Sequence, residues 1–199
     1  RKKSIEKNSI TGNSPAVRKL YGEIMSAAPS IASILITGEN GTGKEMVART
    51  LHQLSLRPEQ PFIIINCAAI PDENLDSELF GHEKGAFEEA TSKNKGKFEL
   101  AAGGTLFFDE IGDMNINTQA KILRALESKT FQRIGGGRTL HMDFRLISSS
   151  NKNLEKEIEA GNFPHLRGKE GLEGNTACSN FQGSIDHAFR TEDSFYIPS

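Results

Sequence analysis

The hydrophobic pattern of the chain alternates short apolar runs with amphipathic stretches up to Phe163. Runs of apolar and β-branched residues predict strands at residues 34–37, 62–66, 105–108 and 144–148. Such near-continuous runs are typical of parallel strands that are covered on both faces, and helical patterns separate the first three. The pattern therefore predicts an α/β fold with a mainly parallel sheet.

Amphipathic stretches predict the helices that accompany these strands. Ser14 followed by Pro15 is a favourable helix start, and the apolar residues that follow recur at helical spacing until about Pro29. These apolar residues, expected on one buried face, are Val17, Leu20, Tyr21, Ile24 and Met25. Two later stretches also have one apolar face each, formed by Val47, Leu51 and Leu54 and by Ile122, Ala125 and Leu126.

The ends of the chain differ from this central pattern. Residues 1–9 are polar and basic, which favours a solvated tail or linker over an arm that binds nucleic acid. Near the other end, a short helix with Leu154 and Ile158 is expected to stop at Gly161. Residues 166–199 are rich in Gly, Ser, Asn and charge. Their apolar residues at helical spacing are Phe181, Ile185 and Phe189.

Composition narrows the classes of protein that fit this pattern. Of the 199 residues, 36% are hydrophobic and 25% charged, an ordinary balance for a globular domain. The net charge of -2 argues against a dedicated nucleic-acid-binding module. Cys67 and Cys178 have neither disulfide nor metal-ligand spacing, so we expect a reducing compartment. No apolar run approaches the roughly 18 to 20 residues that cross a bilayer, and no signal peptide opens the chain, so we expect a cytoplasmic location.

A glycine-rich loop between the first predicted strand and the next helix carries the sharpest chemical signal. It consists of Gly38, Glu39, Asn40, Gly41, Thr42, Gly43 and Lys44. Glycines let successive backbone N–H groups turn toward a phosphate chain, the helix start adds a partial positive charge, and Lys44 supplies a full one. The loop therefore predicts a nucleoside triphosphate site, with a plain glycine-rich turn as the alternative.

Glu45 departs from the usual pattern of such loops, which places a Ser or Thr hydroxyl on Mg²⁺ at this position. The contact would pass to Thr42, to water or to a distant carboxylate. Asp109 and Glu110 follow the third predicted strand, where P-loop proteins place one carboxylate near Mg²⁺ and a neighbour that polarises the attacking water. We expect Asp109 to hold the metal and Glu110 to act as base. A solvated acidic turn is the alternative, which the preceding glycine loop disfavours.

Several further stretches give the chain a specific resemblance. They are GENGTGKE at 38–45, INCAAIP at 65–71, SELFGHEKGAF at 77–87, GGTLFFDEIGDM at 103–114, QAKILRALE at 119–127 and FQRIGG at 131–136. On these motifs, residues 10–163 resemble the central AAA+ domain of sigma-54-dependent transcription activators, the NtrC-like bacterial enhancer-binding proteins. The resemblance defines a nucleotide-binding core at residues 10–165, and Glu45 is also what this family has after the lysine.

The resemblance implies a three-layer ATPase that assembles as a ring, binds ATP and Mg²⁺ at the subunit boundary and remodels sigma-54 RNA polymerase. Lys44 and the loop glycines would bind ATP, Asp109 would coordinate Mg²⁺ and Glu110 would activate water. Asn66 matches the position that holds the catalytic glutamate inactive, although its residue type alone favours a cap on a turn. Asn151 matches the sensor of the γ-phosphate, although alone it favours a helix cap.

One departure from the family lies in the loop that contacts the polymerase. The family has GAFTGA, whereas this chain has Gly85, Ala86, Phe87, Glu88, Glu89 and Ala90. The apolar tip Phe87 is present. The two carboxylates add negative charge and remove the backbone freedom of a glycine at the surface that meets the sigma factor. The sequence therefore leaves sigma-54 binding through this loop open.

A larger departure follows Phe163, where the family's arginine fingers, fifth strand and helical lid are missing or replaced. An arginine supplied in trans contributes about 10³- to 10⁵-fold to phosphoryl transfer, so we expect nucleotide binding with weak hydrolysis. Arg133, Arg145 and Arg167 are possible substitutes, but each is better interpreted as a surface or interface salt-bridge residue. Without the fifth strand, the strand before the glycine loop has an unpaired edge, for which residues 194–197 are a candidate.

These observations favour an ATP-binding AAA+ regulator core with weak ATPase activity. The alternative is a non-hydrolysing nucleotide-binding module that joins or inhibits rings of related subunits. A P-loop kinase fits less well, because no acceptor-substrate motif is present. We recognise no helix-turn-helix, receiver domain or membrane segment, so the expected partners are sigma-54 RNA polymerase and like or related AAA+ subunits.

Overall fold

The computed structural model describes residue 10, residues 14–159 and residues 194–197. The expected tail at 1–9, the helix stop at Gly161, Arg167, Cys178 and the stripe of Phe181, Ile185 and Phe189 lie outside these residues. Within the described part, none of the helices is long and apolar enough to cross a membrane.

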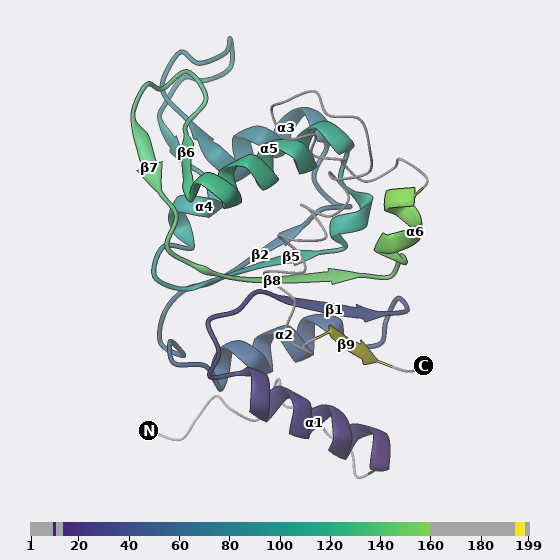
Figure 1. Ribbon diagram of the computed structural model, residues 1–199. Helices are drawn as coiled ribbons and strands as arrows, with labels where there is room; N and C mark the ends of the chain where they lie inside the picture. Colours follow the sequence, from purple (N-terminus) through teal and green to yellow (C-terminus); the bar gives the residue numbers. More distant parts are fainter. Residues whose placement is uncertain (1–9, 11–13, 160–193, 198–199) are drawn as a thin grey trace, which may run out of the picture.

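A parallel five-stranded sheet forms the centre of the molecule, in the order β2-β5-β8-β1-β9. Its strands are β1 (Ile34–Gly38), β2 (Phe62–Asn66), β5 (Thr105–Asp109), β8 (Arg145–Ser150) and β9 (Ser194–Ile197). Helices α1 (Pro15–Ala27) and α2 (Lys44–Gln53) cover one face, and α3 (Asp72–Phe80) and α5 (Ile116–Ser128) cover the other (Figure 1). The predicted three-layer α/β fold is confirmed.

Two apolar clusters fill the space on either side of the sheet. Ile36 and Phe107 belong to the cluster under α1 and α2. Leu106 and Phe108, which alternate with Phe107 along β5, belong to the cluster under α3 and α5. This alternation is the ordinary period of two of a strand that is buried on both faces. It also decides which side of the sheet each polar residue at a strand end faces.

The sheet edges differ from the expected uniform burial. We predicted that β2 would be buried on both faces, but its first three residues are only partly buried. The reason is the strand order, since among the described strands β2 is at the edge and pairs with β5 only. At the opposite edge, β9 pairs in parallel with β1, with Ser194 beside Leu35. The expectation that residues 194–197 cover this edge is confirmed.

The helices begin and end close to the expected positions. Ser14 caps α1, because its Oγ accepts a hydrogen bond from Val17 N–H at 3.3 Å. The predicted buried face of α1 was too wide: Ile24 is fully buried, but Tyr21 and Met25 are 43% and 50% exposed. Leu54 was also wrongly placed on the apolar face of α2. It follows the last turn of that helix and is 37% exposed.

Two small antiparallel hairpins lie on the side of the sheet that α3 and α5 cover (Figure 1), and the hydrophobic pattern did not predict them. β3 (Gly81–His82) pairs with β4 (Asn94–Lys95), and β6 (Thr130–Gln132) pairs with β7 (Thr139–His141). We call these two hairpins the hairpin pair. They pack tightly together, since a Cβ added to Gly135 would lie 2.7 Å from the Ala86 Cβ. Two short helical segments, α4 (Lys97–Leu100) and α6 (Leu154–Glu159), complete the described elements with the 3-10 turn η2 (Ile111–Asp113).

Candidate functional site

The residues that we predicted to bind nucleotide and metal lie together at the carboxyl end of the parallel strands. Glycine loop 38–44 follows β1, Asp109 ends β5, Asn66 ends β2 and Asn151 follows β8. The register places Asn66 directly opposite Asp109. The carboxyl end of a parallel sheet is the usual ligand site of open α/β folds.

The glycine loop has the backbone geometry of an anion cradle. Gly41 and Gly43 have φ values of 81° and 90°, a left-handed conformation that other residues adopt at a cost. A Cβ added at either position would meet no heavy atom within 4 Å, so the space beside the loop is open. Helix α2 begins directly after Gly43, and its first N–H groups can donate to an anion there.

Lys44 lies at the centre of this arrangement. Its side chain is only 5% exposed, and its Nζ donates to the main-chain oxygens of Gly38 and Glu39 at 2.9 Å each. The same Nζ lies 2.9 Å from Glu110 Oε1, in an ion pair. The charge of the lysine is therefore shared between the loop carbonyl groups and Glu110.

Glu110 also joins the glycine loop to the end of β8. Its Oε2 accepts a hydrogen bond from the N–H of Asn151 at 2.8 Å, and the Asn151 side-chain amide donates to Asn40 Oδ1 at 2.8 Å. Glu110 is one of two described non-glycine residues with positive φ, at 55°. The predicted base, lysine and sensor residue thus form one connected group.

Asp109 is held by a residue that the sequence analysis missed. Ser149 Oγ donates to Asp109 Oδ1 at 2.6 Å, and the N–H of Glu110 donates to Ser149 Oγ at 3.0 Å. Ser149 is fully buried. Only the strand pairing of β5 and β8 reveals this contact, because the two residues are forty positions apart in the chain.

Three of the predicted site residues have local partners. Asn66 Oδ1 accepts from the N–H groups of Ala68 and Ala69 at 3.1 Å each, so this side chain caps the turn after β2. Thr42 Oγ1 donates to the carbonyl oxygen of Glu39 at 2.8 Å. Glu45 forms an ion pair with Arg49 one turn further along α2, at 2.7 Å. The regulatory role of Asn66 stays a prediction.

The donor set suits a magnesium ion that is held mainly by phosphate and water. Mg²⁺ prefers oxygen ligands and usually takes only one or two carboxylates beside substrate phosphates. Asp109 offers such a carboxylate, and among the described residues no cluster of three or more His, Cys, Asp or Glu side chains forms a protein-only metal cage.

Burial raises the pKa of the neighbouring Cys67 thiol, and the charges of Asp109 and Asp113 raise it further. Cys67 is therefore a neutral thiol and a poor nucleophile.

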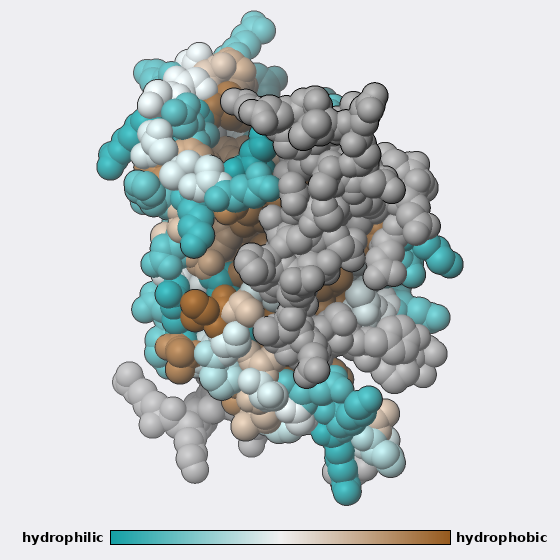
Figure 2. All heavy atoms as spheres, in the orientation of Figure 1, coloured by the Kyte–Doolittle hydropathy of each residue, from teal (hydrophilic) through white to brown (hydrophobic). Residues whose placement is uncertain are grey.

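The predicted partner loop, Gly85 to Glu89, lies between the strands of the β3–β4 hairpin. Phe87 is 41% exposed and packs edge-to-face against His82, with ring centroids 4.9 Å apart. Glu88 and Glu89 are both exposed. Figure 2 shows mainly hydrophilic side chains over the hairpin region at the upper left of Figure 1.

Two candidate finger arginines have structural partners. Arg133 is a salt-bridge residue, as expected, and pairs with Glu83 at 2.6 Å and with Glu99, although its side chain is only 10% exposed. The expectation for Arg145 as a surface or interface residue is wrong. It is buried in β8 and donates to the carbonyl oxygens of Ala27 and Ala28 at the end of α1, at 2.8 and 2.7 Å.

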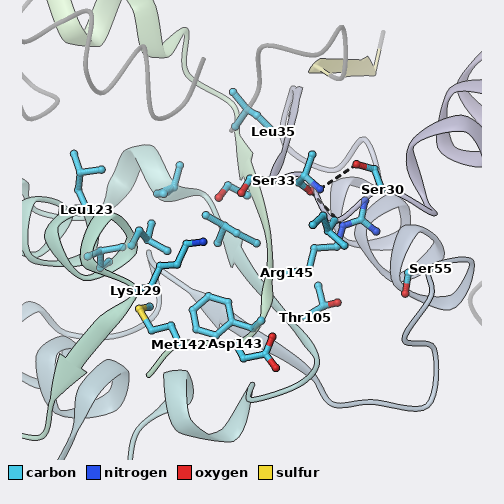
Figure 3. A pocket seen from close by; sticks show the side chains of 18 of the residues that line it. Ser30, Ser33, Leu35, Ser55, Thr105, Leu123, Lys129, Met142, Asp143 and Arg145 are labelled. Atoms are coloured by element: carbon cyan, nitrogen blue, oxygen red, sulfur yellow. Dashed lines mark hydrogen bonds between the residues drawn. The ribbon is translucent and has the colours of Figure 1, made fainter. Parts of the chain in front are cut away.

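A separate cavity of about 850 Å³ lies over β1 and β8 beside α5 (Figure 3). Leu35, Leu123 and Met142 are among the side chains that line it. Ser148 lines it as well. Among its described lining residues, none belongs to the glycine loop or the acidic pair. The cavity is therefore distinct from the edge where the predicted chemistry gathers.

The sheet order, the glycine loop and the acidic strand end define a P-loop α/β domain. A family model described as the Sigma-54 interaction domain matches residues 10–166, and the chain belongs to this family. The Nif-specific regulatory protein of Azospirillum lipoferum is 51% identical over 156 residues, and ZraR of Klebsiella oxytoca is 50% identical over 154. These matches cover 78% and 77% of this chain but only 25% and 35% of those proteins.

Solved structures agree with this assignment. NtrX from Brucella abortus, in complex with ATP, has a TM-score of 0.78 and 35% identity, over 100% of this chain and 40% of that one. The P-loop NTPase domain of a sigma-54 activator from E. coli has a TM-score of 0.55 at 17% identity, which supports the fold alone. The fold is that of the AAA+ domains of sigma-54 activators.

Proposed function

We propose that this chain is the AAA+ core of a sigma-54-dependent transcription regulator, which binds ATP with Mg²⁺ and hydrolyses it weakly. The observation that carries the proposal is the position of Lys44, between the open glycine loop and Glu110 at the end of the sheet. The ATP complex of NtrX, which shares this fold, supports a nucleotide ligand.

Different residues of the site would bind the phosphate chain, the metal and the terminal phosphate. The loop N–H groups and the start of α2 would hold the phosphate chain, and Lys44 would neutralise its outer end. Asp109 would hold the metal through its water shell, and Mg²⁺ would offset the charge that develops on the phosphates. Asn151 would sense the terminal phosphate, since it already contacts the loop through Asn40.

Glu110 is the residue on which hydrolysis depends. A carboxylate that pairs with Lys44 at 2.9 Å has its negative charge partly offset, and its other oxygen is occupied by the N–H of Asn151. This contact must open before Glu110 can accept a proton from water. The engagement of Arg133 with Glu83 and of Arg145 with the carbonyl oxygen of Ala28 supports weak hydrolysis, because both guanidinium groups already have partners within the chain.

The same contacts favour one second candidate, a nucleotide-binding subunit that does not hydrolyse and that joins or inhibits rings of related AAA+ subunits. The two candidates share the nucleotide site and differ in phosphate release. We place either assembly in the cytoplasm, with sigma-54 RNA polymerase as the partner of the loop that carries Phe87. Phosphate release by the chain alone, and in mixture with an intact relative, separates them.

The proposed site is tested by replacing its lysine. Lys44→Ala should weaken ATP binding by at least about 100-fold, because it removes the charge that faces the phosphates. Binding is measured with a fluorescent ATP analogue and Mg²⁺, and thermal unfolding confirms that the variant folds. Lys19→Ala is the matched control, since Lys19 is 82% exposed on α1. Equal affinity of the Lys44 variant and the wild type would exclude this loop as the site.

A further inference from the structure

Ser149 is a buried polar residue beside the acidic residues to which the expected reaction assigns no role. It lies on β8, has no exposed surface and contacts both acidic residues of the site. We propose that the Ser149 hydroxyl is a positioning residue, which fixes the Asp109 carboxylate and the Glu110 main chain for metal binding. The inference rests on the proposed function, because the metal accompanies the nucleotide.

The chemistry of a hydroxyl fixes the direction of both hydrogen bonds. The N–H of Glu110 can only donate, so Ser149 Oγ accepts from it at 3.0 Å. The single hydroxyl proton is then directed to Asp109 Oδ1 at 2.6 Å, a short distance typical of a charge-assisted bond to an ionised carboxylate. The hydrogen bond therefore fixes the orientation of the Asp109 carboxylate, because it restricts rotation of that side chain.

The alternation of side chains along the strands places this contact on the face that holds the glycine loop. Ile147 of β8 and Phe107 of β5 belong to the cluster beneath α2, and Ser149 and Asp109 are two positions further along the same strands. Ser148 belongs to the opposite face, where it lines the separate cavity. The side chains of Ser148 and Ser149 therefore lie on opposite faces of the sheet.

The bond to Glu110 adds a second constraint. Glu110 has a positive φ of 55°, which a glutamate adopts only when its surroundings hold it there. The Ser149 hydroxyl secures the N–H of this residue, while Lys44 and Asn151 hold its carboxylate. One buried hydroxyl therefore couples the conformation of the proposed metal ligand to that of the proposed base.

Ser149→Ala tests the inference, and Ser148→Ala is the matched control on the same strand. The first readout is hydrogen exchange of the Glu110 amide in the nucleotide-free protein, followed by NMR. Exchange should become about tenfold faster in the Ser149 variant, as expected for loss of one hydrogen bond. It should stay unchanged in the Ser148 variant. Unchanged exchange in both variants would overturn the inference.

The second readout is the Mg²⁺ concentration at which binding of a fluorescent ATP analogue is half-maximally enhanced. Ser149→Ala should raise this midpoint about 10- to 100-fold, the usual effect of removing a hydrogen-bond partner of a metal ligand. Its affinity for the analogue in EDTA should match that of the wild type. An equal midpoint, or an equal loss of affinity with and without Mg²⁺, would overturn the positioning role.

Failure of the proposed function would look different. In that case the wild-type protein itself would bind no nucleotide, at any Mg²⁺ concentration, and the metal part of the inference would be refuted with it. A wild type that binds normally, together with an unaltered Ser149 variant, would refute the positioning role alone.

Discussion

Different contacts stabilise two regions of the molecule: the carboxyl end of the sheet, where we propose the nucleotide site, and the hairpin pair. At the carboxyl end of the sheet, Glu110 contacts both Lys44 and Asn151 directly, and β5 and β8, which lead into Glu110 and Asn151, are paired in parallel. In the hairpin pair, strands of two or three residues are joined through Arg133, which pairs with Glu83 of one hairpin and with Glu99 of α4.

The difference has a physical consequence for how each region tolerates change. The site residues lie at the ends of strands in a five-stranded sheet with an apolar cluster on each face, so a substitution there should alter chemistry more than folding. The hairpins have little core of their own, so a substitution at Arg133 should alter their order more than the chemistry of the site. Substitutions in each region can test whether the other region is unaffected.

Glu110→Gln should have the largest effect, and it should be confined to the site. The amide cannot accept a proton from water, so phosphate release should fall by about 100-fold or more relative to the wild type. The ion pair with Lys44 disappears, so the lysine is free to meet phosphate and ATP should bind about three- to tenfold more tightly. Phosphate-release assays and binding titrations provide the measurement.

The matched control for that change is Glu127→Gln, at an exposed position on α5. It should leave both quantities at their wild-type values. Weaker ATP binding by the Glu110 variant would contradict the view that Lys44 is shared between the carboxylate and the nucleotide.

Arg133→Ala should have an intermediate effect, on stability and not on nucleotide binding. Its loss leaves Glu83 and Glu99 without their shared partner, so Tm should fall by roughly 2–8 °C, as expected for one partly buried charge-assisted contact in a domain of this size. Arg124→Ala, at an exposed position on α5, is the control. A large loss of ATP affinity in the Arg133 variant would show that the two regions are coupled.

The Arg133→Ala variant also tests how the stability of the fold depends on pH. Hydrogen bonding to Arg133 lowers the pKa of Glu83 below its ordinary value, with a smaller contribution from Lys93. A carboxyl whose pKa is lower in the folded state stabilises the fold above its unfolded pKa, and this contribution is lost as pH falls through the folded value. The stability difference between wild type and Arg133→Ala should therefore be full at neutral pH and shrink below about pH 4. Unfolding curves at several pH values measure it.

The two regions also differ in how far the sequence predicts them. The strands of the sheet are apolar runs, and the glycine loop has a fixed spacing, so the sequence could predict that Lys44 lies beside the acidic residues after β5, where it contacts Glu110. The hairpins could not, because two-residue strands have no measurable alternation. Ser149 was missed for another reason: its partner is set by strand order, and a run of three serines gives no indication of which one faces the site.

Changing the tip of the partner loop should have the smallest effect on the protein itself. Glu88 and Glu89 are exposed, so the double substitution Glu88→Thr, Glu89→Gly should change stability by no more than about 0.5 kcal/mol and leave ATP affinity unaltered. Its effect should appear only with a partner. Removing two negative charges beside the exposed Phe87 should increase binding to sigma-54, and adding backbone freedom should let the tip adapt to that surface.

That substitution is best measured as sigma-54 capture in the presence of Mg²⁺ and a non-hydrolysable ATP analogue. Phe87→Ala in the substituted loop is the control, because it removes the apolar contact and should cancel the gain. Unchanged sigma-54 binding by the double variant would show that this loop is not the contact surface. A gain in sigma-54 binding together with unaltered ATP affinity would show that partner binding by the hairpin pair can change without any change at the nucleotide site. This is the independence of the two regions that we infer from the different contacts that stabilise them.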